Sequence, residues 1–467
     1  MVFSSAVFLL YFLPIVYLGN ALIKKEYSNY FLLSASLLFY AWGEPIYIII
    51  MLASVTFNWI FGMILDRITK PHGRKIILGI GIACNLLVLF YFKYFNFFGE
   101  IVKKIFGKEI VGQMEEISLP IGISFFTFQA ISYIFDVYRK DTEASKRLVN
   151  VALYISFFPQ LIAGPIVKYK DINKQINERS INSDGLYAGF KRFIYGLGKK
   201  VLIANVLGLC ADKIYAIPID LLAGSTAWIG AVAYTFQIYY DFSGYSDMAI
   251  GLGKMFGFDI QENFNYPYQS HSITEFWRRW HISLGTWFRE YLYIPLGGNK
   301  KGKFRTYINL GVVFLLTGLW HGADMSYVIW GIYHGFFAIV ERCGLKKLLD
   351  KCKFISLLYA LIIVNFGWVL FRAESLYIGL RYLKHMILPW KYTYTSVDIW
   401  NYMDTKTVIC FLLALLGAGM IKDFCPPRVK NKWKGSISES IYCICVLILS
   451  LAAIASDTYN PFIYFQF

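Results

Sequence analysis

The feature that most restricts the fold of this chain is a series of apolar runs that recurs along all 467 residues. A helix needs about 20 mostly apolar residues to cross the hydrocarbon core of a bilayer. Charged residues make up only 16% of the chain, whereas soluble globular proteins carry about 25%. The sequence therefore predicts an all-α polytopic membrane protein, with candidate helices at 3–23, 29–42, 45–66, 76–98, 118–138, 148–167, 189–211, 224–253, 305–322, 326–345, 355–372, 406–421 and 437–456.

The lengths of these runs predict roughly eleven transmembrane helices, accompanied by re-entrant helices. The runs 29–42 and 406–421 are too short to span alone, and 224–253 could divide into two pieces. Charges follow the first run instead of preceding it, which favours a first transmembrane helix over a cleaved signal peptide. No repeat or polar linker divides the chain, so we expect one membrane domain over 1–467.

The distribution of Lys and Arg predicts the orientation, because short loops rich in these residues stay on the cytoplasmic side. Basic loops follow the first, third and fifth runs, which places the N-terminus outside and 67–75 inside. The same rule places 297–305 and 344–354 inside and 389–406 outside. This bias explains the formal net charge of +16. Nucleic-acid binding would need a basic soluble face with aromatic residues, so we expect a lipid membrane and no nucleic acid as partner.

Three segments are too polar to face lipid. The first, 157–172, contains Pro159, Gly164 and Pro165, which interrupt helical hydrogen bonding. Such backbone is tolerated at membrane depth only against protein or a wet cavity. The segment is therefore either a re-entrant stretch that lines a cavity or a simple interfacial turn.

The second segment, 236–268, holds Asp241 and Asp247 inside an apolar window. A buried carboxylate is expensive unless it is paired. Ser243 lies between them, which raises the question of a Ser–His–Asp triad, but the G-x-S-x-G elbow is absent. Structural hydrogen bonding by these three residues is the better interpretation. The eight cysteines show no metal-type spacing, so we expect no metal site.

The third segment, 272–298, combines aromatic residues with charges. Glu275 and Arg279 are four residues apart and can form an ion pair on a helix. An interfacial amphipathic helix explains the Trp and Arg residues, but it does not explain His281. The residues that share one face at helical spacing are Phe276, Trp280, Ser283 and Trp287.

Two of the six histidines lie in the apolar stretch "LTGLWHGADMSYVIWGIYHG", 316–335. His321 lies about 24 Å along the helix axis from Arg305, and His334 in the returning helix can reach a similar depth. Intramembrane ionisable residues mark a functional site by default, and imidazole is the natural general base near neutral pH. A packing role is the alternative for each histidine, but two in one hairpin favour function.

Several long motifs occur in order along the chain. They are "LPIGISFFTFQAISYIFDVYR", "FFPQLIAGPI", "YYDFSGYSDMAIG", "NFNYPY", "FWRRWHISLGTWFREYLYIPLGG", "LTGLWHGA" and "WGIYHG". With these motifs the chain resembles the membrane-bound O-acyltransferase family, specifically the bacterial alginate O-acetylation type. The resemblance is close over 1–345 and loose over the C-terminal helices, 346–467.

The resemblance implies a fold and a set of site residues. The fold is a ring of helices around a thin core, with funnels from the cytoplasmic and extracytoplasmic faces. His321, in "WHG", is implied to be catalytic, His281 to be important in the site, and His334 to be structural. The further candidate residues in the active site are Trp320, Asp241, Ser243, Asn263 and Arg279, with Asp247 and Glu275 in secondary roles.

The resemblance also implies a reaction. Acetyl-CoA in the cytoplasm would donate an acetyl group, without a bound cofactor, to a hydroxyl of an extracytoplasmic polysaccharide. A hydrolase-like acetyltransferase outside the bacterial cytoplasmic membrane would be the partner protein. Basic residues of the inner loop could meet the phosphates of the donor, although topology alone also explains them: Lys300, Lys301, Lys303 and Arg305.

Two further functions stay open at this point. D-alanyl transfer to teichoic acid, from a carrier protein, is a neighbouring branch of the same chemistry. A proton-coupled secondary transporter would also use broken helices and intramembrane carboxylates, but no inverted repeat is visible in the sequence. A non-catalytic scaffold is disfavoured by the intramembrane histidines.

Overall fold

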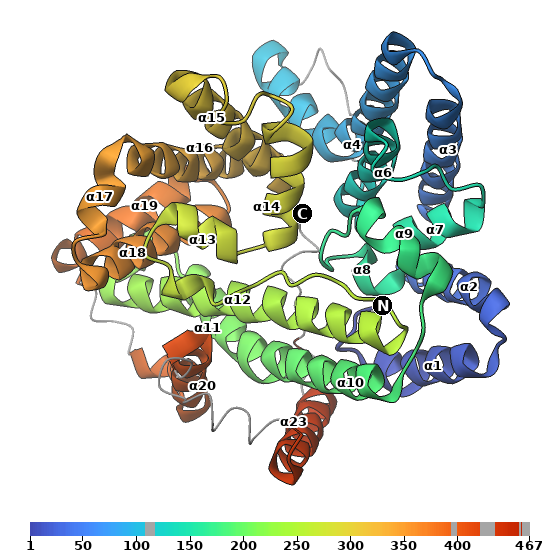
Figure 1. Ribbon diagram of the computed structural model, residues 1–467. Helices are drawn as coiled ribbons and strands as arrows, with labels where there is room; N and C mark the ends of the chain where they lie inside the picture. Colours follow the sequence, from blue (N-terminus) through green and yellow to red (C-terminus); the bar gives the residue numbers. More distant parts are fainter. Residues whose placement is uncertain (108–116, 394–398, 421–434, 457–458, 460–467) are drawn as a thin grey trace. The chain divides into compact units, whose positions relative to one another are not determined.

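In the computed structural model, residues 1–107, 117–393, 399–420, 435–456 and 459 are described (Figure 1). Within these ranges the chain is helical, and its one β-type pairing is an antiparallel bridge between Phe264 and Trp280. The predicted all-α class is therefore confirmed. Residues 394–398 of the predicted outer loop, and residue 421, lie outside the described ranges.

The apolar runs form helices close to where the sequence predicts them. The α-helices are α1 (Leu13–Leu22), α2 (Ser28–Ala41), α3 (Ile48–Arg67), α4 (Pro71–Phe106), α6 (Ile123–Arg139), α7 (Leu148–Ser156), α8 (Phe158–Leu161), α9 (Tyr169–Glu178), α10 (Ser183–Gly198), α11 (Asn205–Tyr215), α12 (Gly224–Met255), α13 (Ile273–Arg279), α14 (Ile282–Phe288), α15 (Gly302–His321), α16 (Met325–Val340), α17 (Lys346–Leu349), α18 (Lys353–Arg372), α19 (Leu376–Ile387), α20 (Thr405–Leu415) and α23 (Ile437–Ser456). A π-helical turn, Lys199–Ala204, joins α10 to α11. The division considered for 224–253 does not occur, because α12 is continuous and contains no proline to interrupt it.

Five helical segments in the described ranges are long and apolar enough to cross a bilayer by length and composition. They are Ile48–Arg67, Pro71–Lys103, Ser183–Tyr215, Lys353–Arg372 and Ile437–Ser456. Two apolar helices, Phe8–Leu22 and Thr405–Gly419, are shorter. The number of roughly eleven spans stays a prediction, as does the division of the remaining helices into spanning and re-entrant ones.

The chain forms two compact units, and the first comprises Met1–Phe190 and Ala249–Gln261. Within it, α3 and α4 are joined by reciprocal amide hydrogen bonds. Asn58 Nδ2 donates to Asn85 Oδ1 at 3.0 Å, and Asn85 Nδ2 donates to Asn58 Oδ1 at 2.8 Å. Both side chains are buried, so each satisfies the other in an apolar surrounding.

The proline-containing segment 157–172 belongs to this first unit. After α7 ends at Ser156, the backbone turns at Phe157 into the single turn of α8. Residues 157–169 are buried throughout. The interrupted backbone is thus enclosed by protein, as a re-entrant stretch would require. The choice between a re-entrant stretch and an interfacial turn stays a prediction.

The second unit comprises Lys191–Met248 and Glu262–Gln466 and contains all of the predicted site residues. In this unit α15 and α16 form a tightly packed hairpin. A Cβ atom at Gly331 would clash with the carbonyl oxygen of Phe314, and one at Gly318 with that of Tyr327. The two backbones can approach this closely only because both positions are glycine. The prediction of one membrane domain over 1–467 stays a prediction.

The segment 272–298 is not the single helix that its spacing suggested. It is divided at His281, whose φ of 46° lies in the left-handed region, into α13 and α14. The Asn265 N–H donates to the Arg279 carbonyl at 2.9 Å, and the Ile282 N–H donates to the Asn263 carbonyl at 3.0 Å. These bonds to a distant segment replace helical ones, so the predicted common face of Phe276, Trp280, Ser283 and Trp287 does not form.

Candidate active site

The side chain of Asn263 is the centre of a buried polar cluster around His281. Its Oδ1 accepts hydrogen bonds from the Ser283 N–H at 3.1 Å and the Ser283 hydroxyl at 2.9 Å. The same oxygen lies 3.1 Å from His281 Nδ1. On its other side, Asn263 Nδ2 donates to Ser246 Oγ at 3.1 Å. All four residues are buried, so these contacts fix the imidazole ring in one orientation.

The backbone of His281 is strained in support of this cluster. Left-handed φ values are uncommon outside glycine, and such a conformation costs of order 1–3 kcal/mol. The Phe264–Trp280 bridge on one side and the start of α14 on the other hold it in place. The strain places the ring of His281 beside Phe242 of α12, with ring centroids 4.7 Å apart.

A cavity of 510 Å³ opens beside His281. Three arginines, Arg278, Arg289 and Arg342, lie along its wall, and none of them forms an ion pair with a carboxylate in the described part of the chain. Thr317 also lines it, one helical turn before the predicted catalytic residue His321. The cavity therefore combines cationic groups with an imidazole. Its other lining residues are Thr274, Trp277, Trp280, Ile282, Leu284, Gly285, Thr286, Phe288, Tyr293, Asn299, Leu310, Val313, Phe314 and Ala338.

His321 is the last residue of α15, whereas His281 precedes a helix, and aromatic rings surround the His321 side chain. Its ring centroid lies 4.8 Å from that of Trp320, and 5.1 Å from those of Trp330 and Phe371. Trp320 also contacts His281, at 6.2 Å between ring centroids. The structure thus connects the two histidines through one indole ring.

His334 is buried among rings as well, and the hairpin brings it to the same tryptophan as His321. Its centroid lies 5.1 Å from both Trp330 and Trp277. Neither of its ring nitrogens has a hydrogen-bond partner among the described residues. A Cβ at position 367 would clash with its Nε2, so Gly367 makes room for the ring. This tight apolar packing agrees with a structural role.

The two carboxylates of α12 are paired with cations from α10 and the π-helical turn. Asp241 lies 2.7 Å from Lys200 Nζ, and the two side chains are 2% and 3% exposed. Asp247 accepts hydrogen bonds from Lys199 at 2.6 Å and from Arg192 Nε at 2.7 Å. The expectation that these carboxylates are paired is confirmed. The cationic partners were not identified from the sequence. The available signal was that Arg192, Lys199 and Lys200 lie within the apolar run 189–211, where a charge needs a partner.

The other predicted residues are separated by the structure. Ser243 is buried, and its hydroxyl has no hydrogen-bond partner among the described residues. The predicted structural hydrogen bonding by Ser243 is therefore wrong, and no triad forms there. The predicted Glu275–Arg279 ion pair is present, with 2.7 Å between its atoms and both side chains about one-third exposed. Arg279 lines a different cavity, of 830 Å³, with Tyr268 and His271. The inner-loop residues Lys300, Lys301, Lys303 and Arg305 are exposed and do not line the cavity of His281.

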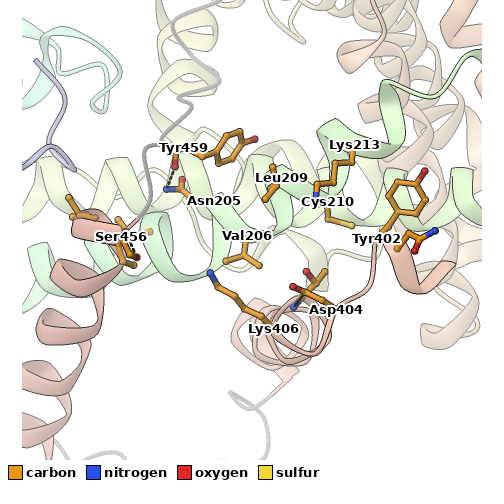
Figure 2. Close-up of a pocket in the computed structure, with 15 residues that line it drawn as sticks. Asn205, Val206, Leu209, Cys210, Lys213, Tyr402, Asp404, Lys406, Ser456 and Tyr459 are labelled. Carbon is orange, nitrogen blue, oxygen red and sulfur yellow. Dashed lines mark hydrogen bonds between the residues drawn. The ribbon is translucent and has the colours of Figure 1, made fainter. Parts of the chain in front are cut away.

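A smaller cavity of 160 Å³ lies between α11, the start of α20 and the end of α23 (Figure 2). Lys213, Asp404 and Lys406 face it, and Asn205 donates to the carbonyl of Tyr459 at 3.2 Å. Hydrogen bonds from Thr407 hold the pKa of the Asp404 carboxyl below its usual value. None of the predicted site residues lines this cavity, so it is not part of the candidate active site.

Over its described residues the chain is helical, several of its apolar segments are long enough to span, and a buried histidine, His281, lines a cavity that His321 does not line. These features are typical of a membrane-embedded enzyme. The chain belongs to the membrane-bound O-acyltransferase family, whose model matches residues 78–378. It is therefore an O-acyltransferase.

Three relatives of known name show which members of the family this chain is similar to. A probable alginate O-acetylase of Pseudomonas putida is 41% identical over 492 residues, covering 100% of both chains. A peptidoglycan O-acetyltransferase of Helicobacter pylori is 35% identical over 83% of this chain and 80% of its own. A teichoic acid D-alanyltransferase of Bacillus subtilis is 30% identical over only 48% of this chain and 58% of its own.

Proposed function

We propose that this protein transfers an acetyl group from acetyl-CoA in the cytoplasm to a hydroxyl of an extracytoplasmic polysaccharide. The observation that carries the proposal is an imidazole at the wall of an arginine-lined cavity, in a chain that matches an alginate O-acetylase over its whole length. The protein would act in the bacterial cytoplasmic membrane with its N-terminus outside. An extracytoplasmic, hydrolase-like acetyltransferase would pass the group on to the polymer.

The donor would bind in the 510 Å³ cavity. Coenzyme A carries phosphates, and guanidinium groups bind phosphate through paired, charge-assisted hydrogen bonds. Arg278, Arg289 and Arg342 line the cavity and can supply such groups. The exposed lysines of the loop that precedes α15 would add only a general attraction for the anionic donor.

His321 would be the general base. Its imidazole takes the proton of the acceptor hydroxyl while the hydroxyl oxygen attacks the thioester carbonyl carbon. The C–S bond then breaks, the acetyl ester forms, and the imidazolium returns its proton to the departing thiolate. As the last residue of α15, His321 lies at the negative end of a helix dipole, which stabilises a cation there by about 0.3–1 kcal/mol. That position favours the imidazolium that the reaction must form.

The alternatives have less support. The D-alanyltransferase relative matches less than half of this chain, which makes carrier-protein chemistry the second candidate. A proton-coupled transporter would need carboxylates that take up and release protons. Asp241 and Asp247 are instead neutralised by Lys200, Lys199 and Arg192.

Membrane vesicles that contain the protein and acetyl-labelled acetyl-CoA provide the test. With the extracytoplasmic acetyltransferase also supplied, we expect label to move to added polysaccharide, and Arg289→Gln to raise the KM for acetyl-CoA. Arg147→Gln changes an exposed arginine outside the cavity; it is the matched control and should leave the KM unchanged. Label that stays in acetyl-CoA, together with transfer from a D-alanyl carrier protein, would overturn the proposal in favour of the second candidate.

A further inference from the structure

The orientation of the Asn263 amide can be assigned from its neighbours alone. A backbone N–H can only donate a hydrogen bond, and the Ser283 N–H points at one atom of this amide at 3.1 Å. That atom must therefore be the oxygen. The opposite end of the amide donates to Ser246 Oγ at 3.1 Å, which agrees with the assignment.

The position of the proton on His281 follows from this orientation. Asn263 Oδ1 has no hydrogen to donate, and it lies 3.1 Å from His281 Nδ1. A hydrogen bond between these two atoms requires the proton on Nδ1. The Ser283 hydroxyl also lies 3.4 Å from Nδ1, but it donates its one hydrogen to Asn263 Oδ1 at 2.9 Å, so it can only accept from the ring. In the neutral ring the lone pair is then on Nε2.

We infer that Asn263 is a positioning residue that holds His281 as a neutral imidazole with its proton on Nδ1, so that Nε2 acts only as a hydrogen-bond acceptor. The surroundings oppose the alternative charged form. His281 occupies the N-cap of α14, where the peptide dipoles present their positive end and favour negative groups over cations. His281 is also only 2% exposed, so a cation there would be poorly hydrated.

The inference limits what His281 can do in acetyl transfer, and in this respect it rests on the proposed function. An acceptor nitrogen cannot donate a hydrogen bond to the oxyanion that forms on the thioester carbonyl. It can accept one from a hydroxyl or amide N–H of a substrate in the cavity, and this orients that group. In this scheme His281 orients a substrate group by accepting a hydrogen bond, and His321 removes the proton from the acceptor hydroxyl.

The first measurement does not depend on activity. In detergent-solubilised protein with ¹⁵N-labelled histidine, protonated and unprotonated ring nitrogens differ widely in chemical shift. The signals of His281 are those lost in His281→Gln. We expect the proton on Nδ1 in the wild type and in Asn263→Asp, which keeps the acceptor oxygen, and a mixture of tautomers in Asn263→Ala. A wild-type ring protonated on Nε2 would overturn the inference whether or not acetyl transfer is detected.

The second measurement uses acetyl transfer in membranes. Asn263→Ala should lower kcat about 10- to 100-fold with little change in KM, because the ring loses its orientation while the arginines remain. Asn263→Asp should recover part of that loss. Asn265→Ala is the matched control, because its exposed side chain lies in the same segment and its backbone hydrogen bond is retained. Equal kcat in folded Asn263→Ala and Asn265→Ala would contradict a positioning role.

Discussion

His281 and His321 are two buried imidazoles that contact one indole ring, yet the structure holds them in opposite ways. His281 is fixed by an amide oxygen at 3.1 Å and a left-handed backbone, at the beginning of a helix. Three aromatic rings, with centroids about 5 Å away, pack around His321 at the end of a helix. Hydrogen bonding determines where a proton resides on the ring, and a helix end determines whether a second proton is favoured. This difference supports the proposed roles, in which His281 accepts a hydrogen bond and His321 takes up a proton.

The largest expected effect concerns the proton-taking side. His321→Ala should lower acetyl transfer about 10²- to 10⁴-fold, the range attributed to general-base catalysis. His321→Asn should be equally inactive, since an amide has no basic nitrogen. The measurement is acetylation per folded molecule, with folded protein quantified by fluorescence-detected gel filtration.

His334→Ala is the contrasting variant for that experiment. The His334 ring fills space between tryptophans, so its removal should lower yield or thermal stability more than turnover per folded molecule. Near-normal acetylation by well-folded His321→Ala would mean that His321 is not the general base, and His281 would become the candidate.

The next largest effect concerns the buried ion pair of Asp241 and Lys200, which lies near His281. Asp241 precedes Phe242, whose ring contacts His281, and it is paired with Lys200 in a buried site. Lys200→Met leaves a buried carboxylate uncompensated, which should cost about 3–5 kcal/mol of stability. The double variant Lys200→Met with Asp241→Leu should regain most of that loss in a detergent melting experiment. A double variant that is stable but inactive would show instead that Asp241 takes part in catalysis.

A smaller effect concerns the close approach of α15 and α16, the hairpin that holds the aromatic rings around His321. Gly331→Ala places a methyl group against the Phe314 carbonyl and displaces Trp330, which packs on His321. Such overpacking should cost about 1–3 kcal/mol. Gly311→Ala in the same hairpin meets no atom within 4 Å and should melt like the wild type. Equal melting of the two variants would show that the hairpin does not need its close approach.

The smallest effect concerns the Glu275–Arg279 pair beside the His281 segment. Both side chains are about one-third exposed, so the pair should contribute under about 1 kcal/mol. Glu275→Ala should accordingly shift the melting temperature very little. A loss of several kcal/mol would mean that this ion pair braces α13 as a buried pair does, and that the His281 region depends on charge as well as on Asn263.

Much of the fold followed from local sequence patterns. The apolar runs became helices, and the predicted hairpin that carries His321 and His334 is present, with both rings against Trp330. The i, i+4 pairing of Glu275 with Arg279 was also correct. Each of these depends on interactions within one helix or between neighbouring helices, which periodicity expresses directly.

The parts that could not be predicted depend on residues far apart in the chain. Periodicity made 272–298 one helix, because it cannot register a break that hydrogen bonds from 263–265 impose. Asn263 lies 18 positions before His281 in the chain, and Lys200 lies 41 before Asp241, so no local spacing joins them. The pattern of charges likewise favoured the loop lysines, which are dense in sequence but do not line the cavity, over the three arginines that do.

The indole of Trp320, which contacts both His281 and His321, has a consequence for the cell as a whole. A membrane that conserves energy as an ion gradient loses it through any continuous thread of water. Trp320 is 5% exposed and packs against both imidazole rings, so its removal would leave between them a space that water could enter. Replacing it with a small residue would therefore be expected to discharge the gradient as well as to slow acetylation, and growth at low membrane potential would reveal the difference.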